Sequence, residues 1–161
     1  MKMIKRLTAL VLITAAAIAA TFVIGMRTKS PPVLNAVRSM NRRVFNPKQM
    51  ETAGSPGASA SVIRHTGRRS GTTYETPIVA IDGGEDFVIV LPYGTQADWF
   101  RNVTASGSAE IVHEGEAWEL VDPRVVSVQS ADEVFTDADR RTHSLFNVTE
   151  ALRLHKARLV G

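Results

Sequence analysis

The most regular feature of the chain is a run of apolar residues near its N-terminus. Leu7 to Met26 contains twenty residues without a charge. At about 1.5 Å per residue, a helix of this length spans roughly 30 Å, the thickness of the hydrocarbon core of a bilayer. The pattern therefore predicts a membrane-spanning helix, because a buried helix of a soluble domain would not need twenty apolar residues.

A secretory signal peptide is the alternative for this segment. Lys2, Lys5 and Arg6 form a basic start, and the alanines at 15–17 could be cleaved. A retained anchor explains the length better, since the apolar region of a signal peptide is usually about 7–15 residues. Positive charge is also heavier after the run than before it, at Arg27, Lys29, Arg38, Arg42 and Arg43. We therefore expect residues 1–29 to anchor the chain in the inner (cytoplasmic) membrane, with the catalytic domain facing the cytoplasm.

A second amphipathic pattern begins after Ser30, where two prolines are typical of a helix start. Residues 33–45 repeat apolar side chains at helical spacing, with three arginines off the stripe: Val33, Val37, Met40 and Val44 against Arg38, Arg42 and Arg43. This helix could lie on the membrane surface, so that residues 7–45 contact lipid, or it could pack its stripe on the domain. Residues 46–60 are rich in Pro, Gly, Ser and Ala and predict a linker, which completes a segment of residues 30–60.

From residue 61 the pattern changes to short strands with closely spaced turns. The predicted strands are Ser61–His65, Thr72–Ile81, Phe87–Leu91, Ala109–His113, Glu116–Val121 and Arg124–Val128. The sequence DGGED at 82–86 predicts a hairpin turn. About six such strands predict a small antiparallel β-barrel over residues 61–161.

Three helices are expected beside the barrel. The first covers residues 97–107, with Asp98 as its N-cap and Gly107 as its stop. The second starts at a capping box, Ser130–Glu133, and continues to about Thr142. The third runs from Thr149 to Leu159.

The net charge of +3 hides an asymmetry between the two parts of the chain. Residues 1–50 carry nine Lys and Arg and no acid, so residues 51–161 hold ten basic and sixteen acidic residues. A nucleic-acid partner is therefore not expected for the folded domain. The absence of cysteine excludes disulfides and thiolate catalysis.

Few residues suggest catalysis by the protein itself. The four histidines, His65, His113, His143 and His155, show no metal-ligand spacing, so we expect structural or surface roles and no metal site. Neither a nucleophile elbow nor a Walker loop is present. An enzyme built on this chain would rely on a cofactor for its chemistry.

The most suggestive motif is the turn HTGRRSGTTYETP at 65–77. Arg68, Arg69, Ser70 and the amides freed by glycine form a compact anion-binding group, although a solvated hairpin tip would look similar. Trp99 and Asn102 follow the central strand on the loop and helix. A large aromatic side chain at this place can face a planar ligand or plug the end of the barrel.

Four segments in this order and spacing resemble the deazaflavin-dependent nitroreductase family. They are HTGRRSGTTYETPI, DGGED, VIVLPYG and DWFRN, and the resemblance covers about residues 61–128. Members of this family are split-β-barrel proteins that use coenzyme F420. The resemblance therefore implies a split antiparallel β-barrel with flanking helices, preceded here by the N-terminal apolar helix.

The resemblance also implies the cofactor-binding residues. The family's basic turn binds the phosphodiester and polyglutamate tail of F420, which here implies Arg68, Arg69, Ser70, Gly71, Thr72 and Thr73. Contacts near the planar ring are implied for Pro77, Ile78, Val79, Leu91, Pro92, Tyr93, Gly94, Trp99 and Asn102. The cofactor carries the chemistry, so no catalytic residue is implied.

The implied function is an F420-dependent oxidoreductase. It would transfer a hydride from the reduced deazaflavin to a small hydrophobic acceptor, such as a quinone or a nitro or enone compound. The predicted anchor favours a lipid-soluble quinone. Two alternatives stay open: a split barrel that binds FMN on the same arginines, and a non-enzymatic binder of a fatty acyl chain or other lipid.

Overall fold

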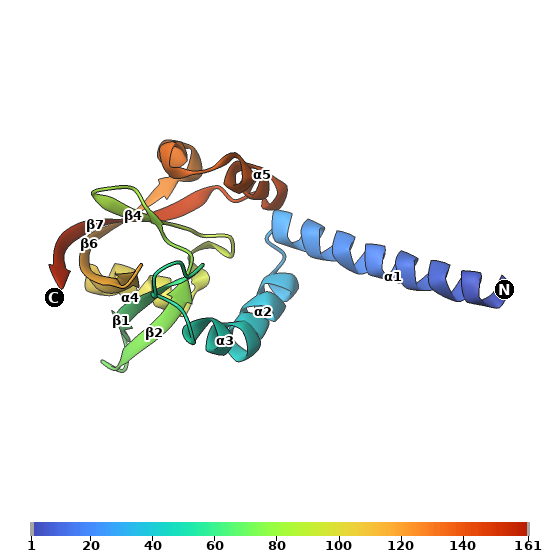
Figure 1. Ribbon diagram of the computed structural model, residues 1–161, viewed down its shortest axis with the longest axis horizontal. Helices are drawn as coiled ribbons and strands as arrows, with labels where there is room; N and C mark the ends of the chain where they lie inside the picture. Colours follow the sequence, from blue (N-terminus) through green and yellow to red (C-terminus); the bar gives the residue numbers. More distant parts are fainter. Residues whose placement is uncertain (1, 161) are drawn as a thin grey trace.

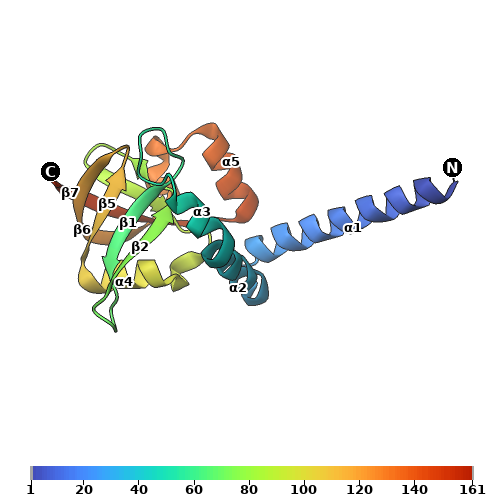
Figure 2. The same ribbon diagram turned by 60° about the horizontal axis from the view of Figure 1, so that its bottom comes forward.

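A long helix projects from a β-domain in the computed structural model, which describes residues 2–160 (Figure 1). The helices are α1 (Lys2–Arg27), α2 (Pro31–Met40), α3 (Asn46–Met50), α4 (Asp98–Ser106) and α5 (Asp137–Phe146), with a π-helical turn joining α2 to α3. In both views α2 and α5 flank the end of α1 that meets the domain (Figures 1 and 2). The span Ile4–Arg27 of α1 contains an 18-residue window with a mean hydropathy of 2.5 and no buried residue, so this helix is long and apolar enough to cross a membrane.

Seven strands form one curled antiparallel sheet, in the order β2-β1-β5-β6-β7-β4-β3. They are β1 (Ser61–Thr66), β2 (Thr73–Ile78), β3 (Ile81–Asp82), β4 (Asp86–Val90), β5 (Ser108–His113), β6 (Glu116–Ser127) and β7 (Glu150–Val160). The curl gives a half-barrel with helices around it (Figure 2), which confirms the predicted split antiparallel β-barrel.

The core fills the inside of this curl. Its fully buried side chains come from α4, which supplies Val103, and from alternate positions of five strands, which supply Ile63, Phe87, Ile89, Ile111, Leu120, Leu152 and Leu154. Alternation places successive side chains on opposite faces of a strand, so one face of each strand meets the others inside the barrel. The barrel thus supplies a rigid frame for the loops at its ends.

The predicted C-terminal helix is wrong, because residues 150–160 form strand β7. Alanine, leucine, arginine and lysine favour a helix here, but the segment lies between β4 and β6 and pairs with both. Leu152 and Leu154, two positions apart, are both completely buried. Tertiary pairing has therefore overridden local propensity.

Two predicted strands, 116–121 and 124–128, are a single strand in the structure. Strand β6 continues through a bulge between Val121 and Arg124, where Asp122 takes a left-handed φ of 56°. A bulge tolerates Pro123, which cannot donate a hydrogen bond to a neighbouring strand. The proline therefore marks an irregularity rather than the end of a strand.

Helix boundaries also differ from the prediction. Ala97, not Asp98, is the N-cap of α4, whereas Gly107 ends this helix in the left-handed region as expected. The predicted capping box at Ser130 lies in a 3-10 helix, Val128–Val134, whose Ala131 has a non-helical φ of −121°. Helix α5 begins later, at a capping box made by Thr136 and Asp139.

The segment predicted as a linker is partly ordered against the barrel. Residues 46–50 form α3, and Gly54 accepts a backbone hydrogen bond from Gly115 at 2.6 Å and donates one to Ala60 at 2.8 Å. Gly54 has a φ of 82°, and an added Cβ would lie 2.9 Å from Val112. Glycine at this point lets the segment lie directly on the β5–β6 hairpin.

Candidate cofactor-binding cleft

A cleft of about 1400 Å³ lies where β2, the end of β4, the start of α4, α5 and residues 35–50 meet. Twelve of the fifteen predicted cofactor-binding residues line it: Arg68, Arg69, Ser70, Pro77, Ile78, Val79, Leu91, Pro92, Tyr93, Gly94, Trp99 and Asn102. The other three, Gly71, Thr72 and Thr73, are exposed at the tip of the β1–β2 turn. The structure therefore gathers residues from four separate stretches of the chain at one cleft.

The basic turn between β1 and β2 is closed by two backbone hydrogen bonds. Gly67 donates to the carbonyl of Thr72, and Gly71 donates to the carbonyl of Gly67, both at 2.8 Å. A Cβ on Gly67 would lie 2.5 Å from the hydroxyl of Ser70 and 2.7 Å from the ring of Tyr74. Glycine is needed here because these two side chains close over the backbone.

Arg68 is held in place by its neighbours. Its backbone amide and its guanidinium both donate to Oδ1 of Asn102, at 3.2 and 2.8 Å. The guanidinium also donates to Asp98 at 3.2 Å, and the Arg68 side chain is 25% exposed. Asn102 therefore fixes the position of this arginine at the rim of the cleft.

His65 supports Arg68 indirectly, through Asn102. The amide nitrogen of Asn102 lies 3.1 Å from Nδ1 of His65, and Nε2 lies 3.1 Å from the hydroxyl of Thr76. Since Oδ1 of Asn102 already accepts from Arg68, its NH2 group faces His65, and Nδ1 must accept. The imidazole is therefore neutral, with its proton on Nε2. Burial lowers the pKa of His65, and the charge of Asp98 opposes this shift.

Arg69 and Ser70 are the exposed part of the turn. Among the described residues, Arg69 makes no side-chain hydrogen bond or ion pair, and Ser70 lies 3.2 Å from the hydroxyl of Tyr74. An exposed guanidinium beside a hydroxyl can bind phosphate or carboxylate groups.

The opposite part of the cleft is apolar. Pro77 and Ile78 are buried, whereas Val79, the residue after β2, is 56% exposed although it is aliphatic. Trp99 is half-buried, packs against the core and contacts Phe100 edge-on at 6.0 Å. The tryptophan thus serves as both a wall of the cleft and part of the barrel's packing, the two roles open to it from the sequence.

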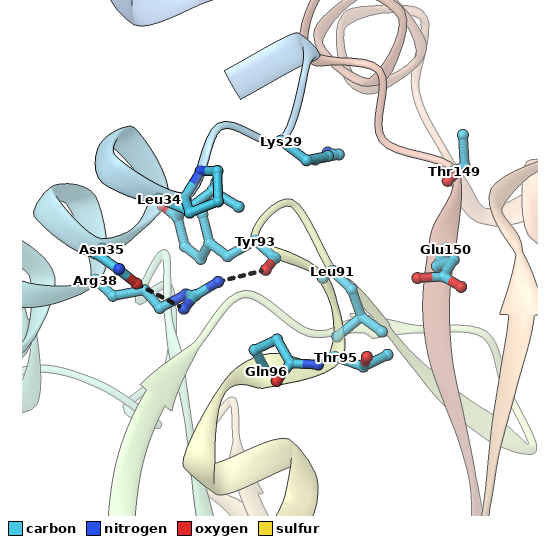
Figure 3. A pocket seen from close by; sticks show the side chains of 12 residues that line it. Lys29, Leu34, Asn35, Arg38, Leu91, Tyr93, Thr95, Gln96, Thr149 and Glu150 are labelled. Carbon is cyan, nitrogen blue, oxygen red and sulfur yellow. Dashed lines mark hydrogen bonds between the residues drawn. The ribbon is translucent and has the colours of Figure 1, made fainter. Parts of the chain in front are cut away.

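The loop Leu91–Gly94 is held from the side of α2. Arg38 donates to the carbonyl of Tyr93 at 3.2 Å (Figure 3). Asn41 donates to the hydroxyl of Tyr93 at 3.1 Å. Sequence reasoning found Tyr93 but missed Arg38 and Asn41 as parts of the cleft. No local motif marks them, because they lie more than fifty positions from Tyr93 in the chain.

His143 is a second buried histidine at the cleft. Its ring contacts Phe135 edge-on at 4.7 Å, and its Nδ1 is buried without a hydrogen-bond partner among the described residues. Burial lowers the pKa of His143, while Asp139 and Asp132 oppose this shift. Histidine was expected to be structural or exposed, and the sequence contained no signal for its place in the cleft.

A smaller cavity of about 510 Å³ shares Leu91, Tyr93 and Gly94 with the lining of the cleft (Figure 3). Lys29 and Arg38 line one side of it, and Glu150 lies across from them (Figure 3). Burial lowers the pKa of Lys29, which the charge of Glu150 opposes. This cavity lies at the junction of the N-terminal helices with the barrel.

The donor set of the larger cleft fits an elongated ligand with an anionic tail and a planar ring. The exposed Arg69 and Ser70 suit the charged end, and the apolar surface of Val79 and Trp99 suits the ring. Among the described residues, no group of three His, Cys, Asp or Glu side chains could hold a metal ion.

The sequence profile of the F420H(2)-dependent quinone reductase family matches residues 37–148. No curated protein matches the chain in sequence. A solved structure described as a domain-swapped dimer aligns with a TM-score of 0.50 at 13% identity, covering 78% of this chain and 100% of that chain. That likeness shows the fold.

Two further solved structures align less closely. One is an F420-H2-dependent reductase, FDR-A, with a TM-score of 0.43 at 14% identity, covering 60% of this chain and 94% of its own. The other is the conserved hypothetical protein Rv2991 from Mycobacterium tuberculosis, with a TM-score of 0.49 at 11% identity, covering 64% and 76%. The family profile spans most of the chain, including the basic turn and the walls of the cleft. The chain belongs to the F420H(2)-dependent quinone reductase family and is an oxidoreductase that uses coenzyme F420.

Proposed function

We propose that this protein reduces a lipid-soluble quinone at the cytoplasmic surface of the inner membrane, with electrons from reduced F420. The observation that carries the proposal is the position of the cleft. Residues of α2, α3 and α5 line the cleft. Helices α2 and α5 also flank the end of α1, an apolar helix long enough to span a bilayer (Figures 1 and 2).

The two ends of the cleft would hold the two ends of the cofactor. Arg69 and Ser70 would bind the phosphodiester and glutamate tail, while Arg68 would complete the charged rim. The ring would lie against the Val79 side of the cleft and the Leu91–Gly94 loop. When bound, reduced F420 supplies a hydride, which carries two electrons and one proton.

The protein's own contribution is to place the cofactor and the acceptor against each other and to exclude water from between them. Trp99 is packed against the core and is therefore a rigid wall against which an acceptor can be oriented. Conversion of a quinone to a hydroquinone needs one further proton, which solvent at the mouth of the cleft can supply. No side chain has to act as a nucleophile.

Lipid contact is proposed for residues 7–45. Helix α1 would span the bilayer, and the π-helical turn Asn41–Phe45 would lie at its surface. This turn exposes two apolar side chains, Val44 and Phe45, next to two exposed arginines, Arg42 and Arg43. Apolar and basic side chains together favour the surface of an anionic membrane.

Ligand identity is tested by titrating the full chain, purified in detergent micelles, with oxidised F420, FMN and oleate. We expect F420 to bind with a shift in its absorbance and the Arg69→Ala variant to bind it more weakly. Arg141→Ala is the matched control, since Arg141 is exposed and lies outside the cleft. Binding of FMN or oleate alone would contradict the proposal.

Location is tested with reporter fusions after residue 161. A reporter active only in the cytoplasm, on a membrane-bound chain of full length, is the expected result. Active periplasmic reporter, or a mature chain shortened near Ala20, would instead support a cleaved signal peptide.

A further inference from the structure

We propose that the bend between α1 and α2 is a rigid joint that fixes the mouth of the cleft at the bilayer surface, so that a quinone enters from the lipid phase. This inference rests on the proposed function and adds a route for the acceptor. It assigns a mechanical role to residues 22–41, which otherwise would serve only as a tether. The joint consists of four sets of contacts.

The first set closes the end of α1. Lys29 has a left-handed φ of 53°, its amide donates to Met26 at 3.3 Å, and the amide of Ser30 donates to Gly25 at 2.8 Å. These two bonds form a Schellman motif, which usually has glycine at the left-handed position. A lysine there adopts an unfavourable backbone conformation, which contacts of its side chain can offset.

The side chain of Lys29 bridges two parts of the domain. Its Nζ donates to the carbonyl of Pro92 at 3.2 Å and lies 3.4 Å from the carbonyl of Phe146. Pro92 belongs to the loop that walls the cleft, and Phe146 is the last residue of α5. Glycine would suit the backbone better but could make neither bond, which accounts for a lysine at this position.

The second set joins α1 to the C-terminus of α5. The guanidinium of Arg27 donates to the carbonyls of Ser144 and Leu145, at 2.7 and 3.0 Å, and Asn147 donates back to the carbonyl of Arg27 at 3.3 Å. The last carbonyls of a helix lack partners within the helix and attract a positive charge. Arg27 therefore ties the anchor to α5 directly.

The third set is apolar and leaves little room for movement. A Cβ on Gly25 would lie 2.4 Å from a methyl group of Val33, so α1 and α2 touch at this glycine. Met26 is 3% exposed and packs with Leu34 and Val37. Well-packed contacts of this kind hold one geometry because overlap and gaps both cost energy.

The fourth set carries the joint to the cleft itself. Arg38 and Asn41 hold Tyr93 through its carbonyl and its hydroxyl. The ring of Phe22 in α1 contacts Phe146 edge-on, with centroids 6.0 Å apart, and Phe146 also lines the cleft. The anchor thus touches residues on two sides of the cleft, and a membrane-spanning α1 would keep the cleft beside the bilayer.

The test disrupts the joint and leaves the residues of the cleft unchanged. Eight Gly and Ser residues are inserted between Thr28 and Lys29 of the full chain. A flexible segment of this length extends about 16 Å on average, enough to let the domain leave the surface. The assay compares two acceptors, a long-chain quinone embedded in phosphatidylethanolamine–phosphatidylglycerol vesicles and a short-chain water-soluble quinone. We expect turnover of the embedded quinone to fall about tenfold or more, because its effective concentration at the cleft is lost.

The water-soluble quinone and F420 affinity serve as internal controls, and both should stay near their original values. The same insertion after Gly84, in an exposed hairpin where an added Cβ meets no atom within 4 Å, is the matched control. An unchanged ratio between turnover of the embedded quinone and turnover of the water-soluble quinone would overturn the proposal. Loss of F420 binding on insertion would also overturn it, by showing that the bend only supports the cleft wall. Failure of the unaltered chain to bind F420 or to reduce either quinone would instead refute the proposed function.

A second measurement does not depend on activity. Because the chain contains no cysteine, the pair Phe22→Cys and Phe146→Cys can be cross-linked selectively in membranes with a thiol-reactive bifunctional reagent. We expect a cross-link in the otherwise native chain and none in the Thr28–Lys29 insertion variant. A pair with Leu159→Cys in place of Phe146→Cys is the negative control. Absence of the Phe22–Phe146 cross-link in the native chain would show that the joint does not form in the membrane.

Discussion

The neutral state of His65 leads to a prediction about pH. Nδ1 of His65 accepts from Asn102 only while it carries no proton, and Asn102 cannot reverse its amide without losing two bonds from Arg68. The groups around the ring are the Thr76 hydroxyl, the stacked ring of Tyr74, and the charges of Arg68 and Asp98. Acidification should therefore oppose this arrangement and destabilise the fold.

The sign and size follow from linkage. Burial places the pKa of folded His65 below the value of 6.5 expected for an unfolded chain. The unfolded state then binds more protons than the folded state below about pH 6.5. The contribution of neutral His65 to the free energy of unfolding is therefore fully present above this pH and is lost as the pH falls toward the folded pKa. One histidine can contribute up to about 1.4 kcal/mol between pH 7.5 and 5.5. His143, whose pKa burial also lowers, adds a loss of the same sign.

Urea denaturation of the chain at a series of pH values measures this loss, and the His65→Gln variant isolates the part due to His65. We expect the variant to show a shallower dependence on pH and His143→Gln to remove a separate share. Nitrogen NMR of the unaltered chain at neutral pH should show a neutral His65 ring protonated at Nε2. An Nδ1-protonated ring, or an unchanged pH dependence in His65→Gln, would refute this account of the Asn102 contact.

Three further predictions concern single side chains. Arg69→Ala should raise the dissociation constant of F420 by roughly five- to 150-fold at low salt, since a contact to a charged group contributes about 1–3 kcal/mol, whereas Arg141→Ala should not. Trp99→Ala should lower turnover while the barrel still folds, measured by steady-state rates and circular dichroism; normal turnover would limit Trp99 to packing. Lys156 is nearly buried and pairs with Asp82 at 2.6 Å. Lys156→Ala should therefore lower the free energy of unfolding by about 2 kcal/mol in urea titrations, and unchanged stability would mean that solvent replaces this pair.

The strands that sequence predicted well share two properties. Strands β1, β4 and β5 were placed within about two residues, because apolar residues recur along each of them and turn residues bound them. The DGGED turn contains Gly84 at a φ of 89°, a conformation that other residues rarely adopt. Strand β7 lacks such signals, and its composition favours a helix. Its structure depends on two partner strands that lie far from it in the chain.

The candidate site likewise contains residues that the sequence predicts and residues whose place depends on distant parts of the chain. The resemblance placed the turn and the strand ends, and the structure brings twelve of these fifteen residues to one cleft. The resemblance could not place Arg38, Asn41 or Lys29, since their hydrogen-bond partners lie 52 to 117 positions away in the chain. These residues lie on the N-terminal helices, for which sequence allowed either contact with lipid or packing on the domain. The structure shows packing for Leu34 and Val37 and leaves Met40 and Val44 exposed.

The paired arginines of the turn have different surroundings, which predicts a different role for each. Arg68 is committed to Asn102 and Asp98, so much of its charge is already compensated within the protein. Arg69 has no such partner among the described residues and can meet a ligand at full charge. A single arginine could not both brace the turn and remain available to an anion. Loss of Arg68 should therefore affect stability and binding together, whereas loss of Arg69 should affect binding alone.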